Sequence, residues 1–192
     1  MKNINDFLLT ENVTVGQARQ WMRDKDDNAK PNLIKLIHHR FYNRYVKHLS
    51  TINSGFLKMA VSCLMIETME SFRQGKKDTK ARGVGQKMFQ DFFTVEESLF
   101  PGFKDIAPDF YSSIRCGILH QAETTNGWRI LRKDALLNKP NRTINATKFV
   151  KTLEKALENY INMLKASDIN TTIWNHALFK IEDVCENCKI IP

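Results

Sequence analysis

Apolar residues recur at helical spacing along most of this chain. Over 56–74 they cover most of a helix circumference, which predicts a buried central helix, and Gly75 follows where a helix would end. Over 146–166 they form one stripe, which predicts a long amphipathic helix. The same reasoning predicts helices over 14–27, capped by Thr14, over 32–52, with Pro31 in the first turn, and over 86–93 and 170–185.

A further helix is predicted over 109–124, after a connection that contains Pro101, Gly102 and Pro108. Its apolar face is formed by Phe110, Ile114, Gly117 and Ile118. Arg115 and His120 lie on the flank of that face. On an ideal helix the two would be about 140° apart, because each residue turns about 100°, so they need not touch.

The pattern changes after Thr124. Asn126 and Gly127 predict a turn, and Trp128, Ile130 and Ile144 predict short strands of a small hairpin. The sequence therefore predicts an all-α bundle with a small β-hairpin or loop insertion after the 109–124 helix. The 192 residues suit a single domain over 1–192 that can bury a core.

Composition excludes some classes of protein. Hydrophobic residues make up 42% and charged residues 26%, which is ordinary for a globular protein and argues against wholesale disorder. No apolar run approaches the length of a membrane span, and the first residues do not resemble a signal peptide. With four cysteines and no secretory signal, we expect free thiols and a cytoplasmic protein.

The net charge of +8 is unevenly distributed. The stretch 28–66 holds no Asp or Glu, and 129–151 holds several bases against Asp134 alone. Such surfaces attract polyanions, which favours RNA as a partner, although Lys and Arg also simply solvate helix faces. The RNA-binding candidates are Lys35, Arg40, Arg44, Lys47, Arg129, Arg132 and Lys133.

Residues 115–120, Arg-Cys-Gly-Ile-Leu-His, have the form R-x4-H, late in a helical chain and before a polar run. With flanking text at 62–67, 72–75 and 89–93, this resembles the HEPN family (higher eukaryotes and prokaryotes nucleotide-binding) over 56–164. The resemblance implies a HEPN-like bundle that forms a homodimer through the motif helix. It also implies a metal-independent endoribonuclease without cofactors, of the kind found as toxins or phage-defence effectors, with an antitoxin or defence partner. The family often has Asn, Asp or His directly after the Arg, where this chain has Cys116.

The chemistry of the pair is consistent with RNA cleavage. A histidine can move protons to and from the 2′- and 5′-oxygens, and an arginine stabilises the charge that builds on the phosphorane. Arg115 and His120 are therefore the candidate catalytic residues. The candidates for supporting them are Gln121, Glu123, Glu67 and Cys116.

Other interpretations stay open. His120 could be a helix-end histidine that bonds a backbone carbonyl, and Arg115 could be the ion-pair partner of Glu67, Glu70 or Glu123. The domain would then be a non-catalytic HEPN module that binds RNA, a nucleotide or a partner protein. Cys185 and Cys188 form a lone C-x2-C pair, so we expect no metal site there.

Overall fold

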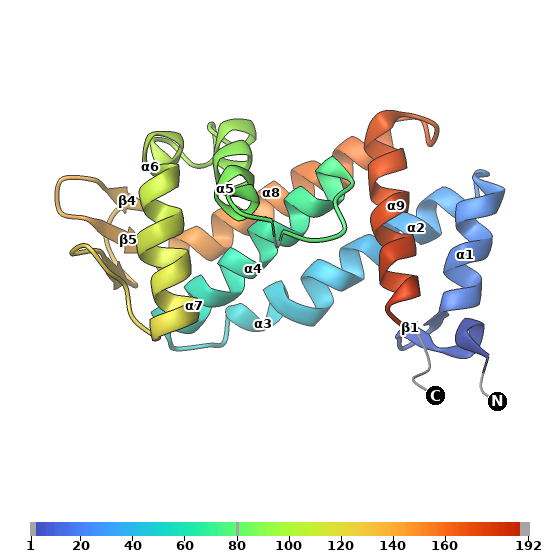
Figure 1. The fold of residues 1–192 in the computed structure, drawn as a ribbon, viewed down its shortest axis with the longest axis horizontal. Coiled ribbons are helices and arrows are strands. Elements are labelled where there is room, and N and C mark those ends of the chain that lie inside the picture. The colour runs from blue at the N-terminus through green and yellow to red at the C-terminus, as the bar shows by residue number, and fades with distance from the viewer. Residues whose placement is uncertain (1–2, 80, 189–192) are drawn as a thin grey trace. The chain divides into compact units, whose positions relative to one another are not determined.

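The computed structural model describes residues 3–79 and 81–188, which are mostly helical with two small sheets (Figure 1). The α-helices are α1 (Val15–Asp24), α2 (Ala29–His38), α3 (Lys47–Leu49), α4 (Gly55–Gln74), α5 (Val84–Val95), α6 (Phe103–Asp109), α7 (Gly117–Gln121), α8 (Ala146–Ala166) and α9 (Thr172–Glu186). The other helices are the 3-10 helix η1 (Ile4–Asp6) and the π-helices η2 (His39–Val46) and η3 (Phe110–Cys116). The strands are β1 (Leu8–Thr10), β2 (Val13–Thr14), β3 (Arg129–Leu131), β4 (Leu137–Asn138) and β5 (Thr143–Asn145).

The prediction of a mostly helical protein is confirmed, and α4 and α8 lie where their patterns place them. Thr14 caps α1 through a capping box with Gln17, but the helix ends early because Lys25 is left-handed (φ 50°). The predicted helix over 32–52 is interrupted, since η2 separates α2 from α3.

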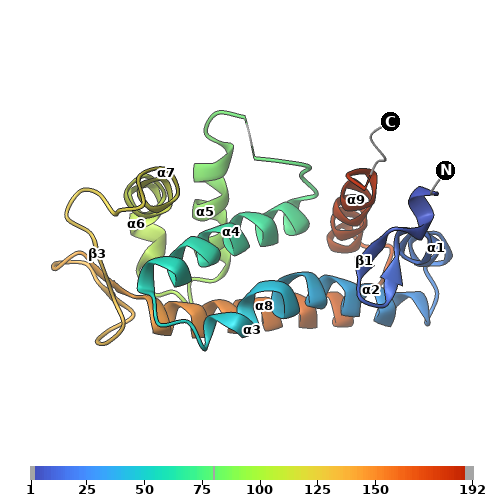
Figure 2. The same ribbon diagram turned by 90° about the horizontal axis from the view of Figure 1, so that it is seen from below.

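The helical segment that carries Arg115 and His120 starts earlier than predicted. Pro108 is not part of a connection but lies inside α6, and the chain stays helical from Phe103 through η3 to Gln121. Pro108 has no backbone N–H to donate to a carbonyl of the preceding turn. The π-helix η3 begins just after this proline. In Figure 2, α6 and α7 are seen almost end-on.

The chain divides into two compact units, and the boundaries between them fall within η2, α4 and α8. The first unit comprises 1–44, 71–78 and 159–192, and the second comprises 45–70 and 79–158. The prediction of a single domain over 1–192 stays a prediction. Both motif residues, Arg115 and His120, belong to the second unit.

A cluster of buried phenylalanines forms the core of the second unit. Phe93 contacts the rings of Phe89, Phe103 and Phe110, with centroids 5.1 to 6.3 Å apart. Phe149 of α8 stacks on Phe110 with the centroids 5.6 Å apart. Edge-to-face and stacked rings at these distances stabilise a core beyond their buried area. The cluster therefore holds the segment with Arg115 and His120 against α5 and α8.

The small sheet of the second unit differs from the predicted hairpin. Ile130 and Ile144 are paired, but β3 and β5 are parallel, and the antiparallel partner of β5 is β4. Trp128 is not in a strand; its indole Nε1 donates to Asp109 at 2.9 Å. Local turn signals predict only sequential hairpins, so they miss a parallel pair that closes around an intervening strand.

The first unit packs α1, α2 and α9 around its own core. Trp174 of α9 is fully buried, and its indole Nε1 donates to the carbonyl of Leu164 at 3.0 Å. Phe41 and Phe72 meet edge to face, with centroids 5.3 Å apart. Arg19 of α1 pairs with Glu182 of α9 at 2.6 Å, so these helices are joined by charge as well as by apolar contact.

Candidate functional site

Arg115 and His120 meet, although ideal helix geometry places them far apart. Nη1 of Arg115 lies 3.2 Å from Nε2 of His120. The sequence spacing left this contact open, and the long side chain of Arg115 reaches along the helix to make it. Arg115 itself lies near the end of the π-helix η3. Insertions of this kind in helices are frequent at functional sites.

Glu67 of α4 holds the opposite edge of the guanidinium. Nε and Nη2 of Arg115 donate to the two carboxylate oxygens at 2.6 and 3.2 Å, a bidentate pair. The hydroxyl of Thr79 donates to the same carboxylate at 3.3 Å. Burial lowers the pKa of Arg115, but the hydrogen bond and charge of Glu67 outweigh it, so the pKa is raised. The guanidinium is thus permanently charged and fixed in orientation.

The guanidinium still has donors to spare. Glu67 takes two N–H groups and His120 takes one, out of the five that an arginine carries, which leaves about two. One of these is directed loosely at Sγ of Cys116, 4.0 Å from Nη1. The ion pair with Glu67 therefore orients Arg115 without using up its capacity to bind an anion.

The contact with Arg115 also bears on the tautomer of His120. Arginine can only donate, so Nε2 of His120 must accept, and the proton of a neutral imidazole then lies on Nδ1. A neutral imidazole is the form that can act as a general base. His120 is exposed at the end of α7, so an incoming ligand can reach it.

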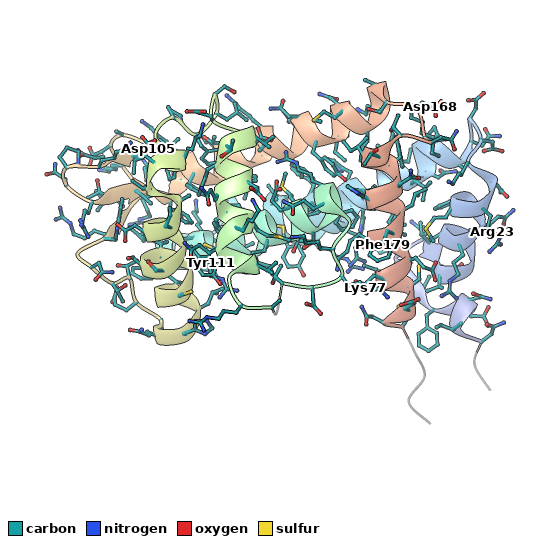
Figure 3. The ribbon with its side chains drawn as sticks, turned by 45° about the horizontal axis from the view of Figure 1, so that its top comes forward. Arg23, Lys77, Asp105, Tyr111, Asp168 and Phe179 are labelled. Carbon is teal, nitrogen blue, oxygen red and sulfur yellow. The ribbon has the colours of Figure 1, made fainter. Side chains whose placement is uncertain are left out.

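Tyr111 is a member of this cluster that the sequence analysis missed. The guanidinium carbon of Arg115 lies 5.3 Å from the centre of the Tyr111 ring, which is a cation–π distance. Tyr111 is labelled in Figure 3. Its ring also packs on Phe89 of α5, with centroids 5.5 Å apart. Burial raises the pKa of the Tyr111 phenol, so this ring stays neutral and apolar. The sequence could have indicated Tyr111, because it lies one helical turn before Arg115. Thr79 lies in a loop, and nothing in the sequence pointed to it.

The chain after His120 folds back tightly over the helix. Ala122 is left-handed (φ 56°), and its N–H bonds the carbonyls of Gly117 and Ile118. A Cβ at Gly117 would lie 2.5 Å from the carbonyl oxygen of Glu123, so only glycine fits there. The N–H of Thr125 then bonds the carbonyl of Ser113 at 3.0 Å. This return fixes the end of the helix that presents His120.

Asp109 also holds the segment after His120 in place through hydrogen bonds. Its carboxylate accepts from the Ser113 hydroxyl at 2.6 Å and from the Trp128 indole at 2.9 Å. Asn126 donates to the Ser113 hydroxyl at 2.9 Å. Burial raises the pKa of Asp109, but these hydrogen bonds and the charge of Arg142 outweigh it and lower the pKa overall. The carboxylate is therefore the stable form.

The other predicted supporting residues are placed less centrally. Gln121 and Glu123 are both exposed beside His120, and Glu123 accepts from the N–H of Thr124 at 2.9 Å rather than from Arg115. Cys116 is half-buried next to Arg115. Glu70 is buried on α4, but the acid that contacts Arg115 is Glu67. Of the three acids proposed for Arg115, the structure thus brings one to it.

The predicted RNA-binding residues fall into both units. Lys35, Arg40 and Arg44 belong to the first unit, where the Arg44 guanidinium donates to the carbonyl of Leu9. The second unit contains the exposed residues Lys47, Arg129, Arg132 and Lys133. The latter set therefore shares a unit with Arg115 and His120.

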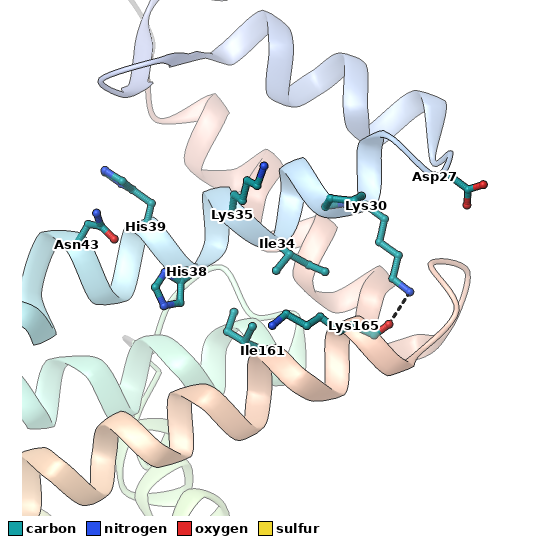
Figure 4. Close-up of a pocket in the computed structure, with 10 residues that line it drawn as sticks. Asp27, Lys30, Ile34, Lys35, His38, His39, Asn43, Ile161 and Lys165 are labelled. Atoms are coloured by element: carbon teal, nitrogen blue, oxygen red, sulfur yellow. Dashed lines mark hydrogen bonds between the residues drawn. The ribbon is translucent and has the colours of Figure 1, made fainter.

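A pocket of about 790 Å³ lies in the first unit, between α2, the start of η2 and the end of α8 (Figure 4). Ile34 of α2 and Ile161 of α8 line it together with Lys35, and Asp27 is at one end. Lys30 is not free for a ligand, since its ammonium donates to the carbonyls of Lys165 and Ser167 at 2.9 and 2.7 Å. Neither motif residue lines this pocket.

Within residues 3–79 and 81–188, no group of three or more His, Cys, Asp or Glu side chains is arranged to hold a metal ion. Cys185 is buried, and burial raises its pKa to about 11, so it is a thiol rather than a thiolate. Across the same described ranges, none of the helices combines the length and apolar character needed to cross a membrane.

Comparisons of the chain with protein-family models, with curated proteins and with solved structures give no significant match. What this site does must therefore be argued from its own residues.

Proposed function

We propose that this protein is a metal-independent endoribonuclease whose catalytic residues are Arg115 and His120. The observation that carries the proposal is the 3.2 Å contact between Nη1 of Arg115 and Nε2 of His120, on an exposed helix end. The contact places a fixed positive charge beside a neutral imidazole. These are the two groups that cleavage of a phosphodiester without a metal requires.

The reaction would proceed by attack of the ribose 2′-oxygen on phosphorus. An RNA phosphate entering the site takes over the Nη1 hydrogen bond from His120, which frees Nε2 to accept the 2′-hydroxyl proton. The new bond from the 2′-oxygen to phosphorus forms as the bond to the 5′-oxygen breaks, and the 5′-oxygen leaves with the proton that the imidazolium of His120 gives back. The phosphorane carries more charge than the substrate, so Arg115 stabilises it selectively.

Glu67 and Tyr111 serve as positioning residues in this proposal. The bidentate pair with Glu67 fixes the plane of the guanidinium, and the Tyr111 ring lies beneath it. An arginine held in place loses little entropy when it meets the transition state, so the catalytic contribution of its charge increases.

The proposal includes a homodimer through the motif helix, in which two Arg/His pairs line one cleft. Leu119, directly before His120, is 44% exposed and would supply apolar contact in an isologous interface. The resemblance to HEPN proteins extends the proposal to a role as a toxin or phage-defence effector with an antitoxin or defence partner.

The alternative is a non-catalytic HEPN module that binds RNA, a nucleotide or a partner protein. The partly buried ion pair between Arg115 and Glu67 favours this alternative, because a purely structural arginine would make the same contact. The two candidates differ in whether a covalent bond is broken.

The test is an incubation of the full chain with RNA in EDTA, followed by analysis of the product ends. The proposal expects 2′,3′-cyclic phosphate and 5′-hydroxyl ends, and no cleavage where the attacking ribose is replaced by deoxyribose. Binding of the RNA without any cleavage would favour the alternative. Cleavage that depends on a divalent ion would contradict both.

A further inference from the structure

A second pocket, of about 740 Å³, lies entirely within the second unit. Its walls come from the segment before α4, the end of β3 with the residues after it, and the starts of α4 and α8. The lining residues are Ser50, Thr51, Ile52, Asn53, Lys58, Leu131, Arg132, Lys133, Asp134 and Thr147.

Lys58 is the unusual residue of this pocket. Its side chain lies in the first turn of α4 and is only 5% exposed. Within the described residues, no hydrogen bond or ion pair engages its ammonium. The stem of this lysine is buried while its ammonium opens into the pocket without a partner among those residues, so the ammonium is placed to bind an anion there.

The helix ends supply no negative charge that could pair with Lys58. The first turns of α4 and α8 contain no acidic residue, although the N-terminal end of a helix carries partial positive charge. Lys58 of α4 and Thr147 of α8 bring both ends to the pocket. A cation in the first turn is the opposite of what helix stability favours, so the stability of α4 does not explain Lys58.

Two further cations line the pocket. Arg132 and Lys133 are exposed, and Asp134 is the single acid among the lining residues. Arg132 also donates to the carbonyl of Asn53 on the opposite wall at 3.3 Å. Three positive side chains around a space of this size suit a phosphate group and its attached sugar.

The walls are fixed before any ligand arrives. The side chain of Asn145 donates to the carbonyl of Asp134 at 2.9 Å, and its oxygen caps the N–H groups of Thr147 and Lys148 at 3.0 Å. A Cβ at Gly55 would lie 2.9 Å from Ile130, so α4 starts close against β3. Little reorganisation is needed to bind an anion here, which favours affinity.

We propose that this pocket binds a phosphate group of RNA, with Lys58 as its buried anchor and with Arg132 and Lys133 at its rim. The choice of RNA rests on the proposed function, whereas the affinity for phosphate rests on the pocket itself. The pocket holds the substrate and takes no part in bond cleavage.

The test measures RNA affinity in a chain that carries His120→Ala, so that cleavage does not interfere. In this background Lys58→Met should raise the dissociation constant by about tenfold or more, as expected for a lost bond to a charged group. Lys155→Met removes the same charge from an exposed position of the same unit and should change affinity less than about threefold.

Thermal unfolding without ligand supplies a second readout. The ammonium of Lys58 has no partner to lose among the described residues and methionine replaces its buried stem, so the melting temperature of Lys58→Met should equal or exceed that of the parent. Inorganic phosphate, compared with chloride at equal ionic strength, should raise the melting temperature of the parent but not of Lys58→Met. Should Lys58→Met fail to fold, Lys133→Gln should still raise the dissociation constant severalfold.

Equal losses of affinity in Lys58→Met and Lys155→Met would overturn the proposal, because charge alone would then explain binding. Stabilisation by inorganic phosphate with unchanged RNA affinity would overturn the choice of RNA and leave a site for free phosphate. Neither result depends on whether the parent chain cleaves RNA.

Discussion

Nη1 of Arg115 lies 3.2 Å from Nε2 of His120, five residues further along the chain. The long side chain of Arg115 reaches this contact while Glu67 holds the other edge of its guanidinium. The conformation of the arginine side chain, and not only the identity of the two residues, therefore creates the candidate site.

Glu67→Gln should weaken both stability and cleavage. The Arg115–Glu67 pair is only 18% and 13% exposed, so losing its charge should lower the free energy of unfolding by about 1–3 kcal/mol. Cleavage should fall about tenfold or more, since Arg115 loses its orientation. Urea denaturation and single-turnover kinetics measure the two effects. Glu97→Gln, which breaks the exposed pair with Lys104, is the control and should change stability by less than about 0.5 kcal/mol.

Tyr111→Leu should lower the cleavage rate several-fold, while Tyr111→Phe should keep it near the parental value. Both changes remove the phenol hydroxyl, but only leucine removes the aromatic face that lies 5.3 Å from the guanidinium carbon of Arg115. Rates at saturating RNA make the comparison. If the phenylalanine variant were as slow as the leucine variant, the ring would not be what positions Arg115.

Gly117→Ala should destabilise the chain by about 1–3 kcal/mol, because a Cβ there would lie 2.5 Å from the backbone oxygen of Glu123. The clash involves backbone on both sides, so the return after His120 must shift. Ser112→Ala, at an exposed position of the same helical segment, should stay within about 0.5 kcal/mol. Equal melting temperatures for the two variants would show that the return is not tightly packed.

Asp109 should make the stability of the chain depend on pH in the acid range. Its pKa in the folded chain is lowered below the ordinary value of an aspartate, so its contribution to stability is present above that ordinary value and is lost as the pH falls through the folded pKa. Denaturation measured from pH 5 down to pH 2 should therefore show that the free energy of unfolding falls more steeply in the parent than in Asp109→Asn. Parallel curves would mean that the bonds to Ser113 and Trp128 do not favour the carboxylate.

Helices with a clear apolar pattern were predictable from the sequence, and the small sheet only in part. The stripes of α4 and α8 and the capping box at Thr14 are local signals, and the structure follows them. The parallel pairing of β3 with β5 depends on contacts across an intervening strand, which no local rule describes. The division into two units likewise arises from packing between distant segments.

The residues of the site were predictable as types but not as contacts. Arg115, His120 and Glu67 were candidates, yet the sequence offered three acids for Arg115 and did not distinguish among them. The contact between Arg115 and His120 depends on the conformation of a long side chain, which the sequence does not specify. The burial of Lys58 was also invisible, because a lysine in a basic stretch is ordinarily exposed.

Single-turnover cleavage of RNA in EDTA by the parent and by His120→Ala tests the central claim most directly. Loss of a general base should slow cleavage by about a hundredfold or more while the dissociation constant for RNA changes little. Cleavage by His120→Ala at the parental rate would contradict the assignment of Arg115 and His120 as the catalytic pair.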